Sequence, residues 1–266
     1  MFNATLFFHE LRANYRLLLL FLIVLSLYMG VIITMFDPAL GSALDALSES
    51  MPGLFAAFGM MNPGATLLQF LANYLYGFLL IAFPLVFLIM LSNKLVARYV
   101  DHGSMAYLLA TPHTRRSIIL TQMLVLLSST LLLVLFVTLF GILLSHLAFP
   151  GALDVGTFLL LNLGWLCLLL FLGGLCFFFS CLFNDSRRSY GFGIGLTIAF
   201  LLVQMLSQVG DKLEGLRYAT PLSLFQPTAI LAGDAAQIWM LGLLFLLGAA
   251  LFTAGAIIFT KKDMPL

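Results

Sequence analysis

Charged residues are scarce in this sequence. Lys and Arg number 12 and Asp and Glu 11 among 266 residues, so 9% of the chain is charged while 62% is hydrophobic. A soluble domain carries about a quarter of its residues as charges. The composition therefore excludes an ordinary soluble protein and indicates an integral membrane protein. The net charge of +1 gives no support for nucleic-acid binding.

Cysteines are few as well. Cys167, Cys176 and Cys181 lie in one apolar run. Their spacing matches neither a zinc site nor a redox-active pair. We interpret all three as packing residues, which excludes a disulfide scaffold or a metal centre built from them.

Nucleotide-binding and catalytic patterns are also missing. The chain contains no Walker A loop and no HExxH motif, and its histidines stand near the ends of the apolar runs. We therefore expect no enzyme and no catalytic, cofactor-binding or metal-binding residue in this chain. The string Gly191-Phe192-Gly193-Ile194-Gly195 looks like a nucleotide loop. No strand precedes it, so we interpret it as a site of close helix packing.

Long apolar runs predict an all-α membrane protein with six transmembrane helices. About twenty apolar residues are needed to cross a hydrocarbon core of about 30 Å. The expected spans are residues 17–36, 65–93, 117–149, 157–183, 191–209 and 238–260. Pro84 lies near the middle of the second run and predicts a kink there. No repeat or soluble domain interrupts the runs, so residues 1–266 form a single transmembrane domain.

Residues 1–16 are expected to form an amphipathic interfacial helix before the first span. Apolar and polar side chains segregate to opposite faces: Ala4, Phe7, Phe8, Leu11 and Tyr15 against Thr5, His9, Arg12 and Arg16. Such a helix lies in the membrane interface. The alternative is a simple charged flank to the first span.

Basic residues are distributed unevenly between the two ends of the expected spans. Ten fall on one side: Arg12, Arg16, Lys94, Arg98, Arg115, Arg116, Arg187, Arg188, Lys261 and Lys262. Lys212 and Arg217 fall on the other. Because Lys and Arg near span ends stay inside, both termini are expected in the cytoplasm. The outer segments are residues 37–64 and 210–237, and we expect the second to dip into the outer leaflet as a helix-turn-helix.

No Asp, Glu, Lys or Arg falls within the hydrocarbon part of these expected spans. Proton-coupled and sodium-coupled carriers place such groups near the middle of the membrane. An ion-coupled carrier is therefore disfavoured. If this chain moves a substrate uphill, a partner must supply the energy.

The polar segment Lys94–Arg116 separates the second span from the third. Gly103 and Ser104 within it are typical of a helix end followed by a new N-cap. A short helix over residues 105–110 must then end before Thr111-Pro112, because the residue before a proline avoids the α region. The segment is thus expected to form a cytoplasmic elbow of short helix and turn.

Three stretches resemble the ABC-2 type transporter permeases, the six-span membrane subunits of ABC exporters. The first is the elbow, with Asp101-His102-Gly103-Ser104 and Leu108-Leu109-Ala110-Thr111-Pro112-His113-Thr114-Arg115. The second is Met51-Pro52-Gly53-Leu54-Phe55-Ala56-Ala57-Phe58-Gly59 before the second span, and the third is the ending Phe259-Thr260-Lys261-Lys262-Asp263. Many members carry a further acid two residues before Asp101, where this chain has Tyr99, so a contact made by that acid cannot be carried over.

The resemblance implies the membrane-spanning subunit of an ATP-driven exporter in the cytoplasmic membrane of a bacterium. ATP and Mg would be bound by a separate ATPase subunit, and a second permease chain, identical or related, would complete the path among the membrane lipids. Apolar and aromatic path residues would suit a hydrophobic or amphipathic substrate such as a peptide, lipid or drug-like molecule. The elbow would be the coupling helix, with these residues toward the ATPase: Asp101, Gly103, Met105, Tyr107, Leu108, Leu109, Thr111, Pro112, Arg115 and Arg116.

Two other classes of function remain open on the sequence. One is a membrane-embedded, lipid-modifying enzyme, and the other is a membrane anchor for a signalling complex. The elbow itself has a simpler interpretation as an ordinary positively charged inner loop, and its apolar side chains could lie against lipid.

Overall fold

The computed structural model describes residues 3–36, 50–51, 66–105, 108, 113–208 and 211–262. The helices of these residues, in chain order, are α1 (Ala4–Met35), α4 (Leu67–Tyr74), α5 (Leu79–Leu95), α6 (Ala97–Asp101), α8 (Arg115–Ala148), α9 (Val155–Leu182), α10 (Ser186–Ser207), the 3₁₀ helices η2 (Asp211–Ala219) and η3 (Pro221–Leu224), α11 (Pro227–Leu231) and α12 (Ala235–Lys261). Six helical stretches are long and apolar enough to cross a membrane: Ala4–Met35, Leu79–Asp101, Arg115–Ala148, Val155–Leu182, Ser186–Ser207 and Ala235–Lys261. The predicted number of six candidate membrane-spanning helices is confirmed.

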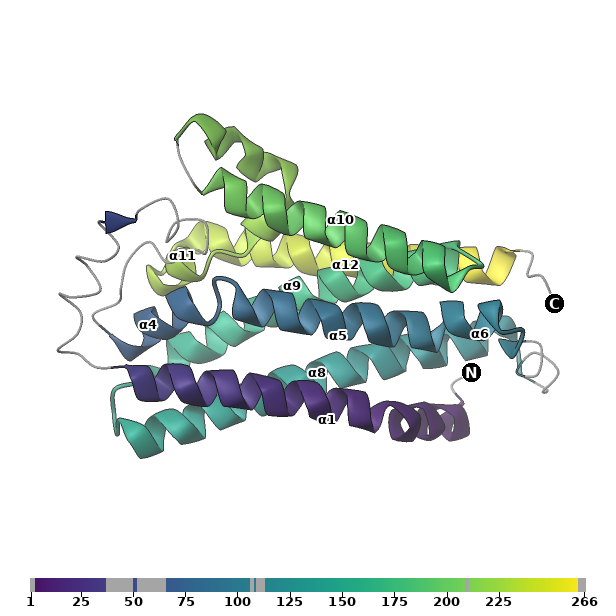
Figure 1. The fold of residues 1–266 in the computed structure, drawn as a ribbon, viewed down its shortest axis with the longest axis horizontal. Helices are drawn as coiled ribbons and strands as arrows, with labels where there is room; N and C mark the ends of the chain where they lie inside the picture. Colours follow the sequence, from purple (N-terminus) through teal and green to yellow (C-terminus); the bar gives the residue numbers. More distant parts are fainter. Residues whose placement is uncertain are drawn as a thin grey trace.

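The long helices form one bundle, with both ends of the chain at the same end (Figure 1). α1 and α8 start at that end and pack along each other. With 32 and 34 residues they measure about 48 and 51 Å, well beyond a hydrocarbon core of about 30 Å. One end of each helix therefore reaches outside the hydrocarbon region.

The first and fifth spans begin earlier than predicted. α1 runs without a break from Ala4, so residues 4–16 and the first span form one helix, capped by the Asn3 side chain. α10 begins at Ser186 because the Asp185 carboxylate accepts a hydrogen bond from the Arg187 amide. An N-cap of this kind fixes the helix start. Arg187 and Arg188 consequently lie in the first turn of α10.

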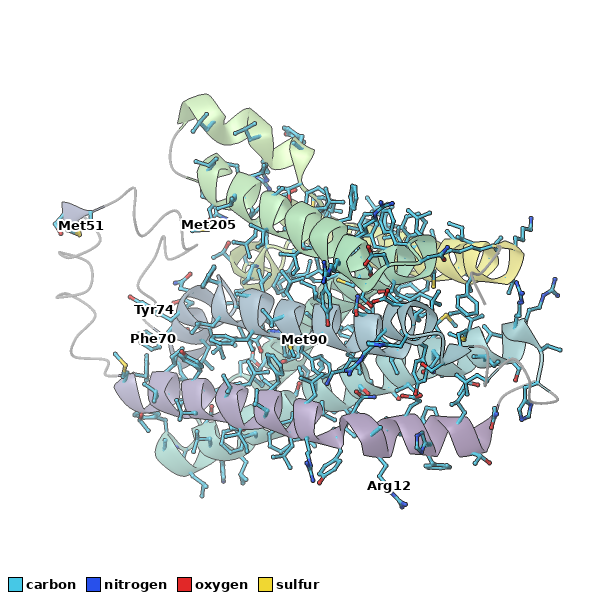
Figure 2. The ribbon with its side chains drawn as sticks, turned by 45° about the vertical axis from the view of Figure 1, so that its right-hand side comes forward. Arg12, Met51, Phe70, Tyr74, Met90 and Met205 are labelled. Atoms are coloured by element: carbon cyan, nitrogen blue, oxygen red, sulfur yellow. The ribbon has the colours of Figure 1, made fainter. Side chains whose placement is uncertain are left out.

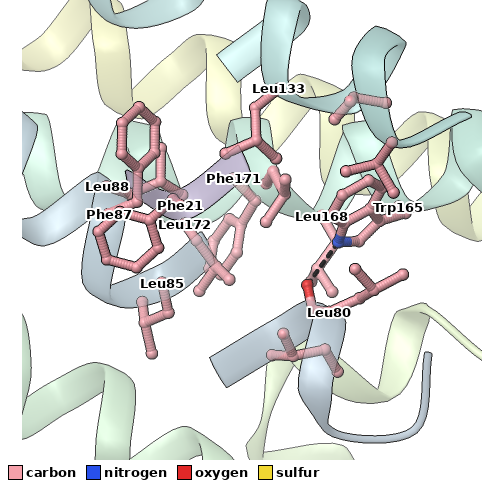
Figure 3. Packing of buried hydrophobic residues seen from close by; sticks show 14 of the residues in the cluster. Phe21, Leu80, Leu85, Phe87, Leu88, Leu133, Trp165, Leu168, Phe171 and Leu172 are labelled. Atoms are coloured by element: carbon pink, nitrogen blue, oxygen red, sulfur yellow. Dashed lines mark hydrogen bonds between the residues drawn. The ribbon is translucent and has the colours of Figure 1, made fainter. Parts of the chain in front are cut away.

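The second span is divided, but not at Pro84. The interruption is a turn over residues 75–78 between α4 and α5, and α5 contains Pro84. A proline leaves the carbonyl four residues earlier without its helical donor. That carbonyl belongs to Leu80, and it accepts a hydrogen bond from the buried Trp165 indole (Figure 3). The neighbouring helix thus supplies the donor that Pro84 lacks.

α9 lies at the centre of the bundle and packs most extensively on α12. Glycines allow this approach: a Cβ added to Gly174 would lie 2.8 Å from the Gly248 carbonyl oxygen, and one on Gly248 would lie 3.0 Å from the backbone of Leu170. The close packing predicted for Gly191, Gly193 and Gly195 is not found within the described residues, because no atom lies within 4 Å of a Cβ added to any of them. Small residues do bring helices together here, but in α9 and α12 rather than in α10.

The segment after α10 folds into short pieces instead of a helix-turn-helix. It consists of η2, η3 and α11, with Pro221 and Pro227 each opening a piece. Phe225 and Ile230 are buried and meet α9 at Gly164, where an added Cβ would be 3.1 Å from each. η3, Phe225 and α11 are therefore part of the packed core at the end away from the termini, whereas η2 packs on α10.

Candidate functional site

α6 forms the first part of the elbow and ends at Asp101. Gly103 has φ +68°, a conformation that favours glycine, so the predicted helix end at this residue is confirmed. The Ser104 hydroxyl donates to the Tyr99 carbonyl at 3.3 Å. Met105 is only 1% exposed and belongs to the core. Met105 therefore anchors this part of the elbow to the bundle.

The remaining residues of the predicted coupling site lie around this anchor. Asp101 and Arg116 are exposed, Arg115 is half-buried, and Leu108 is half-buried against the core. Tyr107, Leu109, Thr111 and Pro112 lie outside the described residues, as does most of the predicted short helix over residues 105–110. The coupling helix and its apolar contact surface therefore stay predictions.

A buried carboxylate joins the elbow to two other helices. Glu10 of α1 is 2% exposed. It accepts hydrogen bonds from the Tyr99 hydroxyl of α6 at 2.6 Å, the Gln122 amide of α8 at 3.3 Å and the Asn14 amide one turn along α1 at 3.4 Å. Buried carboxylates require such donors. We call Glu10, Tyr99 and Gln122 the Glu10 junction.

Sequence reasoning missed Glu10 and Gln122. Tyr99 was noted only as the residue standing where many relatives carry an acid. The structure pairs that tyrosine with an acid from a different helix, 89 positions away in the chain. One feature of the sequence could have drawn attention to this site, because Glu10 is the sole acid among the first 36 residues.

A second set of contacts ties the other side of the elbow to the chain's last span. Arg115, at the start of α8, donates to the Lys262 carbonyl at 3.0 Å. The Lys262 ammonium donates to the carbonyls of Cys181 at 3.1 Å and Leu182 at 2.9 Å, at the end of α9. These carbonyls are the free acceptors of a helix C-terminus, where a cation is favourable. Burial lowers the pKa of Lys262, while the Cys181 thiol nearby acts in the opposite direction.

The elbow is thus fastened on both sides. The Glu10 junction links α6 to α1 and α8, and the Arg115–Lys262 contacts link the start of α8 to the ends of α9 and α12. Arg12 takes no part in either set and points away from the bundle (Figure 2).

Comparison with known proteins decides the family. Residues 5–264 match the family model of the ABC-2 family transporter proteins. This chain belongs to the ABC-2 transporter family. With its six apolar helices it is a multi-pass membrane permease of an ABC transporter, a class of subunit that is generally not catalytic itself. No curated protein and no solved structure matches it.

Proposed function

We propose that this ABC-2 permease is the membrane subunit of an exporter for a hydrophobic or amphipathic substrate, driven by a separate ATPase that binds ATP and Mg. Movement of that ATPase enters the membrane through the elbow. The observation that carries the proposal is the Glu10 junction, in which one buried carboxylate holds α1, α6 and α8 together.

Rigid fastening is what coupling requires. The state of the ATPase can be coupled to the state of the permease only through structural elements that move together. An elbow held by Tyr99 to Glu10, and by Arg115 to Lys262, cannot shift without displacing the helices that carry those partners. The contacts at both sides of the elbow support its role as the entry point of that movement.

The substrate class rests on the apolar character of the spans. Among the described residues, the faces of α8 and α12 that the chain leaves uncovered are rich in leucine and phenylalanine. A second permease chain, identical or related, would cover part of this surface and complete the path. Lipidic or amphipathic cargo fits such walls better than sugars or ions, which need polar groups for each buried hydrogen bond.

The ATPase contact can be tested at the predicted apolar surface of the elbow. Replacing Tyr107 and Leu108 by Ala should abolish co-purification of a co-expressed ATPase subunit or uncouple its hydrolysis from transport, since truncating an interface anchor commonly costs over about 2 kcal/mol. Arg115→Ala alone should weaken the contact mildly and in a salt-dependent way. Full binding and transport in the double variant would move the docking site elsewhere, with residues 2–15 the next segment to test.

The isolated chain provides the matching control on energy supply. Purified permease should hydrolyse no ATP, and hydrolysis should start when the ATPase subunit is added. Hydrolysis by the permease alone, free of contaminants, would overturn the division of labour proposed here.

Orientation in the membrane is a further part of the proposal. The ten-to-two distribution of basic residues favours a cytoplasmic location for both termini and the elbow. A single cysteine at Ser48 or Glu214 should react with an impermeant reagent in intact cells, and one at Ser186 only after permeabilisation. Labelling of Ser186 in intact cells would reverse the topology.

A further inference from the structure

A cavity of about 400 Å³ opens beside the Glu10 junction, between α1 and the α5–α6 segment. Its walls include Lys94, Arg98 and His102, which follow one another at intervals of four residues and so lie along one side of the helical segment. The volume falls within the range of small-ligand pockets, about 300 to 1,000 Å³.

The cavity presents positive charge without a matching acid. Within the described part of the chain, neither Lys94 nor Arg98 has a carboxylate oxygen within 4.0 Å. The one acid in the wall, Glu10, is 2% exposed and accepts from Tyr99, Gln122 and Asn14. A cluster of cations of this kind favours the binding of an anion.

An apolar seam leads away from the cavity along the same two helices. Half-buried Tyr28 of α1 and Phe83 of α5 meet with ring centroids 5.0 Å apart. Met90, one turn before Lys94, is half-buried, and Leu20 and Leu27 of α1 are 53% and 61% exposed. A ligand with a charged head and a hydrocarbon tail would match the cavity and the seam together.

We infer that the cavity binds the phosphate of an anionic glycerophospholipid, with an acyl chain lying on the α1–α5 seam. Lys94 and Arg98 hold the phosphate, and His102 and Ser104 complete the wall. A membrane lipid supplies both an anionic head for the cavity and an apolar chain for the exposed leucines of α1, whereas an acidic segment of a partner protein matches only the charge. This inference does not depend on the proposed coupling to an ATPase.

Native mass spectrometry of the full chain in detergent can test the inference. Phosphatidylglycerol should bind the wild type with higher affinity than diacylglycerol, which has the same chains without the phosphate. In the Lys94→Gln/Arg98→Gln variant its affinity should fall by roughly ten- to hundredfold, since two charge-assisted hydrogen bonds are lost. The Lys94→Arg/Arg98→Lys variant keeps both positive charges and should retain most of the wild-type affinity for phosphatidylglycerol.

The matched control is Arg187→Gln/Arg188→Gln, which removes two exposed cations at the same end of the bundle. Its affinity should equal that of the wild type, and an equal loss in both variants would overturn the assigned cavity. Inorganic phosphate that displaces phosphatidylglycerol at equal concentration would overturn the lipid as ligand. The inference would also be overturned if the Lys94→Gln/Arg98→Gln variant bound the lipid as the wild type does but no longer bound a co-expressed ATPase. In that case the cavity would be a contact site for a protein. If the cavity variant does not fold, equal affinities of the wild type for the two lipids overturn the inference.

Discussion

The α9 core and the Glu10 junction hold the same bundle together by opposite means. Around α9, glycines bring backbones of α9 and α12 into contact, and one hydrogen bond from Trp165 covers the carbonyl left free by Pro84. At the Glu10 junction the helices meet through side-chain hydrogen bonds beside a cavity. Close-packed backbone cannot yield without strain, whereas helices joined through side-chain hydrogen bonds can shift together while those bonds stay intact. The rigid part of the permease is therefore its α9 core, and the part suited to change is the elbow end.

The largest expected effect lies in the α9 core. Gly174→Val would place its Cβ 2.8 Å from the Gly248 carbonyl oxygen, and separating the two backbones should cost about 3 kcal/mol or more. Gly195→Val is the matched control, because no neighbouring element among the described residues lies within 4 Å of its added Cβ. Thermal unfolding in detergent should show a large loss for the first variant and little change for the second. Equal losses would contradict the contrast between α9 and α10.

Trp165→Phe comes next, since it removes the donor to the Leu80 carbonyl as well as part of a fully buried side chain. The expected cost is about 2 to 3 kcal/mol. In a Pro84→Ala background residue 84 regains an amide that can donate to Leu80. The cost of Trp165→Phe should then be smaller, and strict additivity in this double-mutant cycle would rule out the compensation.

At the Glu10 junction, Glu10→Ala should destabilise the protein by about 2 kcal/mol, because it leaves the donors of Tyr99 and Gln122 without their acceptor. Glu10→Gln keeps an acceptor for Tyr99, and its new amide can donate to Gln122 Oε1, which has no partner among the described residues. It should be the milder variant in the same unfolding assay. A larger loss for Gln than for Ala would contradict the hydrogen-bond account of the junction.

The smallest effect is expected at the opposite end of the bundle, where Asp154 caps α9. Hydrogen bonds from the Thr157 hydroxyl and amide hold the pKa of Asp154 below its usual value. The carboxylate therefore stabilises the folded state above the unfolded pKa of about 3.9, and this contribution is lost as the pH falls through the lower folded pKa. Asp154→Asn should unfold with a weaker dependence on pH below about 5 than the wild type. An unchanged pH dependence would contradict a contribution of the Asp154 cap to the stability of the folded state.

Apolar run length was enough to predict six spans, because crossing a bilayer imposes the same requirement on every helix. Contacts between distant residues were not predictable in this way. Pro84 indicates a missing amide, but only the fold brings Trp165 to the free carbonyl. The Gly191–Gly195 string has the composition of a close-packed helix contact, but among the described residues no neighbour lies within 4 Å of a Cβ added to its glycines.

The candidate site likewise combines a feature that local sequence predicts with contacts between distant residues that it does not. The helix end at Gly103 followed from local backbone preference and is confirmed. Glu10, Tyr99 and Gln122 come from three helices, with 89 and 112 positions between Glu10 and its two partners. No local pattern in a single sequence predicts such a meeting.

The central claim is that the Glu10 junction transmits movement of the elbow to α1. The direct measurement is an electron spin distance between labels at Ala13 and Arg188, exposed positions on α1 and α10, in a chain with its native cysteines replaced and the ATPase subunit bound. ATP should change this distance in the wild type and in Tyr190→Phe, a half-buried tyrosine whose hydroxyl forms no hydrogen bond within the described residues. In Tyr99→Phe the ATPase should still bind, and the distance should stay constant. The same ATP-induced change in Tyr99→Phe as in the wild type would contradict the claim.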